Sequence, residues 1–308
     1  MPRQARIDVP GTLYHVMSRG IERRAIFFEE ADYLDFQERL YVWLRKCGAK
    51  CLAWCLMPNH FHLLLLRGER PLSEFMHHAM TGYAVNFNIR HGRVGHLFQN
   101  RYKAIICDIE QYLRELVPYI HLNPLRAELV KDLAGLAGYR WCGHGAVATG
   151  VPDGILDEGL LLEHFGGGDK SPRAAYMELM AEKAAEGKST GALGTFRHDA
   201  EAVSDPRVLG DSDFVEAILR AADEKMNRPP KSRDELLVEA ARITGVEAPD
   251  ILRRTRNRRA ARARAIYCHL CREERISLAE LAEELGIGRS AVCRLAGKGA
   301  AATGGKCG

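Results

Sequence analysis

One apolar stretch, interrupted only by Pro58-Asn59, constrains the fold of this chain more than any other. The runs on its two sides, residues 51–57 and 61–66, are short and apolar. A proline-asparagine pair between two such runs indicates a tight turn. We therefore predict two buried antiparallel strands joined at this turn. Because side chains alternate between the faces of a strand, His60 and His62 are expected to point the same way.

Two imidazoles side by side at the end of a buried strand are able to hold one divalent cation. A His-x-His pair also arises by chance, with both rings satisfied by hydrogen bonds inside a sheet. The hairpin alone leaves both interpretations open, and the rest of the chain has to decide between them.

The remaining pattern of the first half predicts an α+β fold. Strands are predicted at residues 12–18 and 102–107, and helices at residues 29–46 and 71–87, where apolar residues recur at helical spacing. Asp108 is suited to cap a helix that continues to Asn123. This order of elements is typical of an antiparallel sheet with helices packed on it.

Charge divides the 308 residues into three blocks. The net charge is only +4, but residues 1–150 and 231–308 are basic and residues 151–230 are acidic. Basic blocks are typical of nucleic-acid-binding domains. We therefore expect a catalytic domain at residues 1–150, an acidic connector with a few helices at 151–230, and a small DNA-binding domain at 231–300.

The sequence also predicts the compartment. Its longest apolar runs are strand-sized, and no apolar segment follows the first residues as in a signal peptide. The nine cysteines are odd in number and lack the spacing of a disulfide-rich scaffold. We expect a cytoplasmic protein with reduced thiols and no membrane partner.

The C-terminal block has the pattern of a helix-turn-helix. Ser277 is a suitable N-cap, Gly286-Ile-Gly288 indicates a tight turn, and a short helix follows. An ordinary helical hairpin would give the same pattern, but the basic run before it favours DNA binding. The residues expected to contact DNA here are Arg256, Arg258, Arg259, Arg262, Arg289, Ser290 and Arg294.

Four stretches of the first half, in this order and spacing, resemble the single-tyrosine HUH transposases of the smallest bacterial insertion sequences. They are Tyr-His-Val-Met-Ser-Arg-Gly (14–20), Trp-Cys-Leu-Met-Pro-Asn-His-Phe-His-Leu-Leu (54–64), Gly-His-Leu-Phe-Gln-Asn-Arg-Tyr-Lys (95–103) and Tyr-Ile-His-Leu-Asn-Pro-Leu-Arg-Ala (119–127). The branch most similar is the one associated with repetitive extragenic palindromes. Residues 233–297 separately resemble, by pattern, the duplex-DNA-binding domain of the replication initiator DnaA.

The resemblance implies a ferredoxin-like HUH nuclease fold and a specific chemistry. It assigns His60 and His62 to a divalent metal, Mg²⁺ or Mn²⁺, and Tyr119 to the nucleophile. The family often has glutamine as a third ligand one helical turn later, where this chain has Asn123. The substrate implied is single-stranded hairpin DNA, and the products are a 5′-phosphotyrosine and a free 3′-hydroxyl.

Several alternatives stay open at this level. Tyr119 and Asn123 are four residues apart and share a helix face, but Tyr112 lies on that face too and is a rival nucleophile. Arg101 and Lys103 are expected to hold the DNA backbone, or to be ordinary solvated side chains. A relaxase or rolling-circle initiator would use the same chemistry, and a DNA-binding regulator could retain the fold without it. Both a homodimer and a monomer agree with the sequence.

Overall fold

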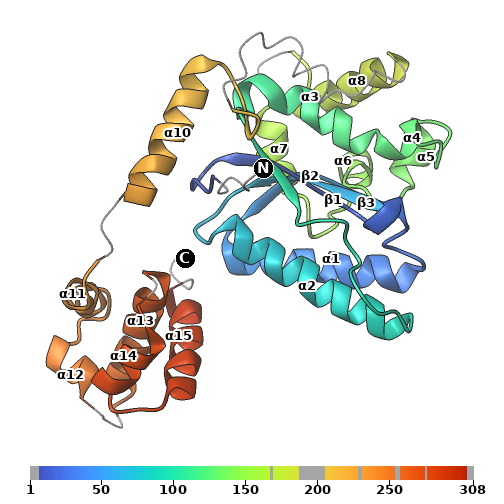
Figure 1. Cartoon of the computed structure of the whole chain (residues 1–308). Helices are drawn as coiled ribbons and strands as arrows, with labels where there is room; N and C mark the ends of the chain where they lie inside the picture. The colour runs from blue at the N-terminus through green and yellow to red at the C-terminus, as the bar shows by residue number, and fades with distance from the viewer. Residues whose placement is uncertain are drawn as a thin grey trace. The chain divides into compact units, whose positions relative to one another are not determined.

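The computed structural model describes residues 7–166, 169–186, 205–227, 231–253, 257–274 and 276–303. The chain divides into two compact units, Met1–Lys225 and Met226–Gly308. The first is built on a sheet and the second on helices alone (Figure 1). A search of the described ranges finds no helix with the length and apolarity needed to span a bilayer.

A five-stranded sheet forms the centre of the first unit. In the order in which they pair, its strands are β2 (Lys50–Met57), β3 (His60–Leu66), β1 (Leu13–Arg19), β4 (Lys103–Cys107) and β5 (Val208–Leu209). The first four pair antiparallel, which confirms the predicted α+β fold, and β5 pairs parallel with β4. A two-residue strand is too short to show a periodic pattern, so β5 was not expected from the sequence.

The hairpin predicted at Pro58-Asn59 is present. Met57 pairs with His60 across the turn, so only two residues connect β2 and β3. Trp54 and Phe61, one on each strand, are fully buried. The hairpin therefore has the long, nearly all-apolar strands of a sheet covered on both faces.

Helices cover both faces of this sheet (Figure 1). On one face α1 (Glu30–Cys47) and α2 (Leu72–Arg90) bury Tyr14, Val16 and Phe61 of the strands. On the other, α3 (Ile109–His121) packs on Leu13 and Leu64. Shorter helices follow α3; they are α4 (Asn123–Arg126), α5 (Leu133–Ala137), α6 (His144–Thr149), α7 (Glu158–Glu163), α8 (Pro172–Ala185) and α10 (Ser212–Asn227).

Much of the acidic block is part of the first unit. Leu161 of α7 and Met180 of α8 are fully buried in the core beneath α3. Val208 of β5 and Val215 of α10 belong to the core on the opposite face. Residues 187–206 of the acidic block are poor in apolar residues and were expected to be a linker; of these, residues 187–204 lie outside the described residues.

Other segments of the chain pair with the outer edge of β2. The amide nitrogen of Leu56 donates to the carbonyl of Trp141, and the amide nitrogen of Asp157 donates to the carbonyl of Cys51. The backbone groups of this edge strand are thus paired at these points. At the other side of the sheet, the amide nitrogen of Ile106 on β4 donates to the carbonyl of Arg207, next to the outermost strand β5.

A buried polar cluster ties α8 to the C-terminal end of α3. The Tyr176 hydroxyl lies 2.9 Å from Nδ1 of His121 and 2.7 Å from Nδ1 of His144. All three side chains are fully buried. Burial lowers the pKa of His121 well below its usual value and that of His144 to about 4, so both rings are neutral at pH 7. The hydroxyl donates to one ring and accepts from the other.

Removing this hydroxyl is expected to destabilise the protein substantially. Tyr176→Phe leaves two buried imidazole nitrogens without their partner, and each such group costs roughly 1–3 kcal/mol. We expect the free energy of unfolding to fall by about 2–4 kcal/mol in urea titrations.

The matched control is Tyr41→Phe. It makes the same chemical change at a side chain that is 39% exposed, where the effect should stay within about 0.5 kcal/mol. If the two changes lowered the free energy of unfolding equally, the Tyr176 hydroxyl would contribute no more to stability than an exposed tyrosine hydroxyl.

The second unit is a bundle of helices with its own core. Its helices are α11 (Arg233–Thr244), α12 (Ala248–Leu252), α13 (Arg258–Glu273), α14 (Leu278–Glu284) and α15 (Arg289–Thr303). Leu236, Tyr267 and Val292 are buried at its centre. Ser277 caps α14 by accepting from the amide of Ala279, and a short turn containing Gly286, at φ 61°, leads into α15.

Candidate nuclease site

His60 and His62 lie on the face of β3 that α3 covers. In the sheet register, His62 pairs with Met17 and His60 with Arg19 of the neighbouring strand β1. Their ring centroids are 5.2 Å apart. His62 is 6% exposed and His60 half-buried, so the pair sits where the buried strand opens toward solvent, as the alternation of the strand predicted.

The ring of Tyr119 packs against His62. Its centroid is 5.6 Å from that of His62, in an edge-to-face contact. Burial raises the pKa of the Tyr119 hydroxyl, while the positive charge of Arg126 acts to lower it. Arg126 lies 5.9 Å from the ring centroid. A cation in this position favours a phenoxide over the neutral phenol.

In each of the two histidines, Nδ1 is held by a neighbouring side chain. Nδ1 of His60 contacts Oδ1 of Asn59 at 2.6 Å, and Nδ1 of His62 contacts Nε2 of His15 at 2.9 Å. Within the described residues, Nε2 of each ring has no hydrogen-bond partner. Burial lowers the pKa of both rings, so both are neutral at pH 7, the state that coordinates metals.

Asn123 is held by the C-terminal end of α3. The α3 helix ends at His121, and Asn123 begins α4. Its amide nitrogen donates to the carbonyls of Tyr119 at 2.7 Å and Ile120 at 3.2 Å. Among the described residues no hydrogen bond links Asn123 to the two histidines, and its oxygen remains the atom suited to a cation.

Two residues of the site were not predicted from the sequence. His15 is fully buried against His62, and Arg126 faces Tyr119. The signal for Arg126 was its spacing of seven residues from Tyr119, two helical turns. For His15 the signal was weaker, because its contact depends on the pairing of β1 with β3.

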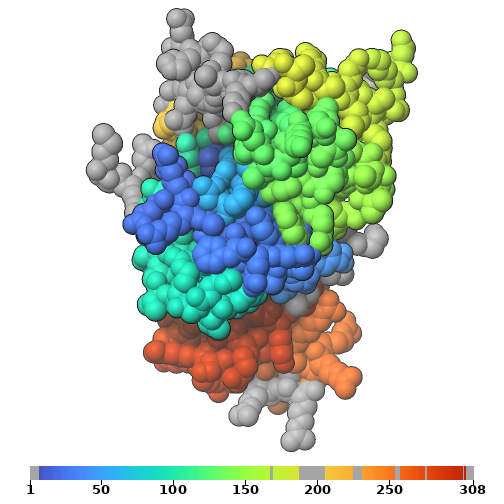
Figure 2. All heavy atoms as spheres, turned by 90° about the vertical axis from the view of Figure 1, so that its right-hand side faces the viewer, coloured from blue at the N-terminus to red at the C-terminus, as the bar shows by residue number. Residues whose placement is uncertain are grey.

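The loop after β1 forms one wall beside the histidines. Its 3₁₀ turn, η1 (Ile21–Arg23), includes Glu22 at φ 54° and Arg23 at φ 60°, in the left-handed region. Non-glycine residues in this conformation are strained, and such strain is common at functional sites. Backbone hydrogen bonds join Gly20 to Asn59 and Ile21 to Leu97. In Figure 2 the blue segment after β1 lies beside the teal segment that follows α2.

The expected DNA-backbone contacts of the first unit are exposed. Lys103 is the first residue of β4 and pairs with Met17 of β1. Its positive charge acts to lower the pKa of His15, so the Lys103 ammonium group lies near the candidate site. Arg101 lies in the segment leading to it. Near them, Arg19 donates to Oε1 of Gln99 at 2.6 Å.

The seven expected DNA contacts of the second unit divide into two groups. The exposed ones are Arg258, Arg259 and Arg262 on α13, and Arg289, Ser290 and Arg294 on α15. Arg256 lies outside the described residues. Arg264, part of the same basic run, is buried and donates to the carbonyls of Ile251 and Arg253. It therefore stabilises the bundle rather than facing DNA.

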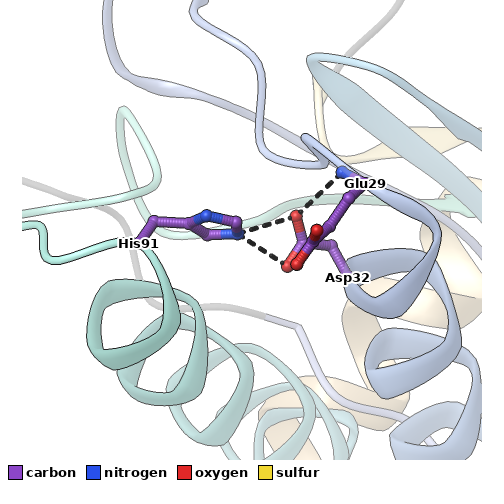
Figure 3. Close-up of side chains that lie close together, drawn as sticks. All are labelled: Glu29, Asp32 and His91. Carbon is purple, nitrogen blue, oxygen red and sulfur yellow. Dashed lines mark hydrogen bonds and ion pairs between the residues drawn. The ribbon is translucent and has the colours of Figure 1, made fainter.

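Within the described ranges, one further group of side chains has ligand atoms close enough together for a metal. Glu29, Asp32 and His91 lie within 4.8 Å of one another (Figure 3). Asp32 accepts from the amides of Phe28 and Glu29 and from Arg90 and His91. Burial acts to raise its pKa, but these hydrogen bonds outweigh it and lower the pKa. We interpret the group as the cap of α1 and its link to α2.

Part of this chain is similar to known proteins. A solved structure described as a REP-associated tyrosine transposase bound to a REP hairpin is similar, with 19% identity and a TM-score of 0.41 over 50% of this chain and 90% of that one. A search of curated proteins finds no match. Residues 8–123 match the family model described as "Transposase IS200 like", and that range contains both histidines, Tyr119 and Asn123. Residues 8–123 of this chain, well under half of its length, are thus similar to the IS200-like transposases.

Proposed function

We propose that the first unit is a single-strand DNA endonuclease and strand transferase that uses Tyr119 as its nucleophile. The observation that carries this proposal is the position of Tyr119, which lies over His62 on the side of the sheet where two ring nitrogens are unpaired. The family match favours a transposase over a relaxase or rolling-circle initiator. A folded single strand is the substrate class that the resemblance implies.

The donor set fits a divalent cation. His60 and His62 would hold it through Nε2, and Oδ1 of Asn123 is the candidate third ligand. Bound Mg²⁺ or Mn²⁺ would polarise a phosphate and neutralise charge that develops on it. Phosphate oxygens suit either ion, whereas imidazole ligands suit Mn²⁺ better.

The reaction conserves the number of phosphodiester bonds. The Tyr119 oxygen forms a bond to phosphorus while the bond from phosphorus to the 3′ oxygen breaks. The tyrosine proton leaves, and the departing 3′ oxygen takes up a proton to become a hydroxyl. The other strand end stays attached as a 5′-phosphotyrosine. Attack by another 3′-hydroxyl reverses the step and joins two strands without ATP.

The residues around Tyr119 have separate tasks in this scheme. A free tyrosine has a pKa of about 10, and Arg126 counteracts the rise that burial causes. Exposed Lys103 and Arg101 are placed to hold the DNA backbone beside the site. The buried histidines supply uncharged rings and take no part in the proton transfer.

We further propose that the second unit binds duplex DNA. The α14 helix, the turn at residues 285–288 and α15 have the order of a helix-turn-helix, with α15 as the helix that enters the major groove. Arg289, Ser290 and Arg294 are exposed on α15, and the exposed arginines at the start of α13 would contact phosphates. A regulator that kept only DNA binding is disfavoured by the intact arrangement of His60, His62 and Tyr119.

A covalent-adduct assay tests the nuclease proposal. The full chain is incubated with end-labelled hairpin DNA that has single-stranded flanks, with Mn²⁺ or with EDTA. We expect a labelled protein band that resists denaturant in Mn²⁺ only, and its loss in His60→Ala. His78→Ala is the matched control, since it removes an exposed histidine of α2. An adduct of equal yield in EDTA would contradict a metal-dependent reaction.

A further inference from the structure

His15 is the most buried of the three histidines at the site, at 0% exposure. It lies on β1, two residues before Met17, which pairs with His62. Nε2 of His15 is 2.9 Å from Nδ1 of His62. The two rings are stacked, with centroids 5.1 Å apart and planes 25° apart. This contact joins β1 to His62, a proposed metal ligand on β3.

We propose that His15 is a positioning residue that fixes the tautomer of His62. In this arrangement Nε2 of His15 accepts the Nδ1 proton of His62, so that Nε2 of His62 keeps its lone pair for a cation. The proposal rests on the metal site of the proposed function, and it assigns His15 a task that neither the motifs nor the family match gives it.

Two combinations of tautomers are possible for the hydrogen-bonded rings of His15 and His62. Each neutral ring carries one proton, and one proton lies in the hydrogen bond between them. If His15 donates, His62 carries its proton on Nε2 and cannot bind a metal there. If His62 donates, its Nε2 is free to coordinate and His15 carries its proton on Nδ1. Only the second arrangement makes His62 a ligand through Nε2.

The surroundings of His15 support its role as a fixed acceptor. The ring of His15 is fully buried, and burial favours a neutral imidazole, which keeps one lone pair. Nδ1 of His15 is buried without a hydrogen-bond partner within the described residues. The bond to His62 is therefore the one that orients the ring. Partners of this kind typically contribute 10- to 100-fold to metal affinity.

A pair of substitutions separates positioning from packing. His15→Phe keeps an aromatic ring against His62 but has no acceptor, whereas His15→Gln loses the ring and keeps an amide oxygen that can accept from Nδ1. If His15 only packs against His62, His15→Phe should keep more Mn²⁺ affinity than His15→Gln. If His15 positions His62, His15→Gln should keep more Mn²⁺ affinity than His15→Phe.

The measurement is Mn²⁺ binding to the full chain by calorimetry, in the absence of DNA. We expect His15→Phe to weaken binding by about 10- to 100-fold and His15→Gln to stay close to wild type. His144→Phe, which replaces a buried histidine bonded to Tyr176, should bind Mn²⁺ like wild type. Circular dichroism confirms that each variant is folded.

The outcomes are distinguishable. If the wild-type chain binds no Mn²⁺, the proposed function itself fails. If wild type binds but His15→Phe binds equally well, or His15→Gln binds as weakly as His15→Phe, the role of His15 is refuted. Should the variants not fold, ¹⁵N NMR of the wild-type chain with Mg²⁺ decides: we expect His15 protonated at Nδ1, and a proton at its Nε2 would overturn the proposal.

Discussion

Tyr119→Phe is expected to abolish the covalent protein–DNA adduct and to lower strand cleavage by at least roughly 10⁴-fold, the scale of loss seen when a nucleophile is removed. The change deletes one oxygen and leaves the ring in its contact with His62. Because the fold and the metal ligands stay in place, Mn²⁺ affinity should not change. The assay is single-turnover cleavage of labelled hairpin DNA, with the adduct resolved on a denaturing gel.

Tyr112→Phe is the matched control for this experiment. Tyr112 lies on the same helix, seven residues and therefore about 10 Å along the axis from Tyr119. Burial raises the pKa of Tyr112, and the charges of Asp108 and Asp211 raise it further. Negative neighbours disfavour a phenoxide, so this variant should cleave normally. An adduct that persists in Tyr119→Phe and disappears in Tyr112→Phe would move the nucleophile to Tyr112.

Removing residues 226–308 is expected to lower the affinity for duplex DNA by at least ~10³-fold, the usual gap between specific and non-specific binding. The two units have separate cores, so the first should fold and still form the adduct with a hairpin. The measurement is fluorescence anisotropy with a labelled duplex at several salt concentrations. The logarithm of the affinity should fall by about 0.9 per phosphate contact for each tenfold rise in salt.

Charge substitutions within the full chain provide the control. Arg289→Gln and Arg294→Gln remove exposed charges of α15, and together they should reduce the salt slope by about 2. Arg242→Gln removes an exposed charge of α11, in the same unit but outside the helix-turn-helix, and should leave the slope unchanged. Equal duplex affinity with and without residues 226–308 would refute the assignment of this unit.

The sequence predicted those parts of the site that depend on local periodicity. His60 and His62 share a face because a strand alternates, and Tyr119 lies on the helix that Asp108 caps. Each of these features can be predicted from a few consecutive residues. Once the strands and the helix are recognised, the position of the histidine pair at the end of β3 follows.

Other parts depend on contacts between distant segments, which no local pattern specifies. The bond between His15 and His62 follows from the register of β1 against β3, 47 residues apart along the chain. No local pattern marks Tyr176, which bonds two buried histidines, His121 and His144. Arg264 was one member of a basic run, and its burial depends on how α12 packs on α13.

The covered edge of β2 has a consequence for association between molecules. Exposed strand edges are templates on which a second chain can add its own strand. Here Trp141 and Asp157 occupy hydrogen-bonding positions of β2. A second copy could extend the sheet at these positions only by displacing a segment of its neighbour. The segment at residues 141–157 thus protects this edge of the first unit against edge-to-edge aggregation.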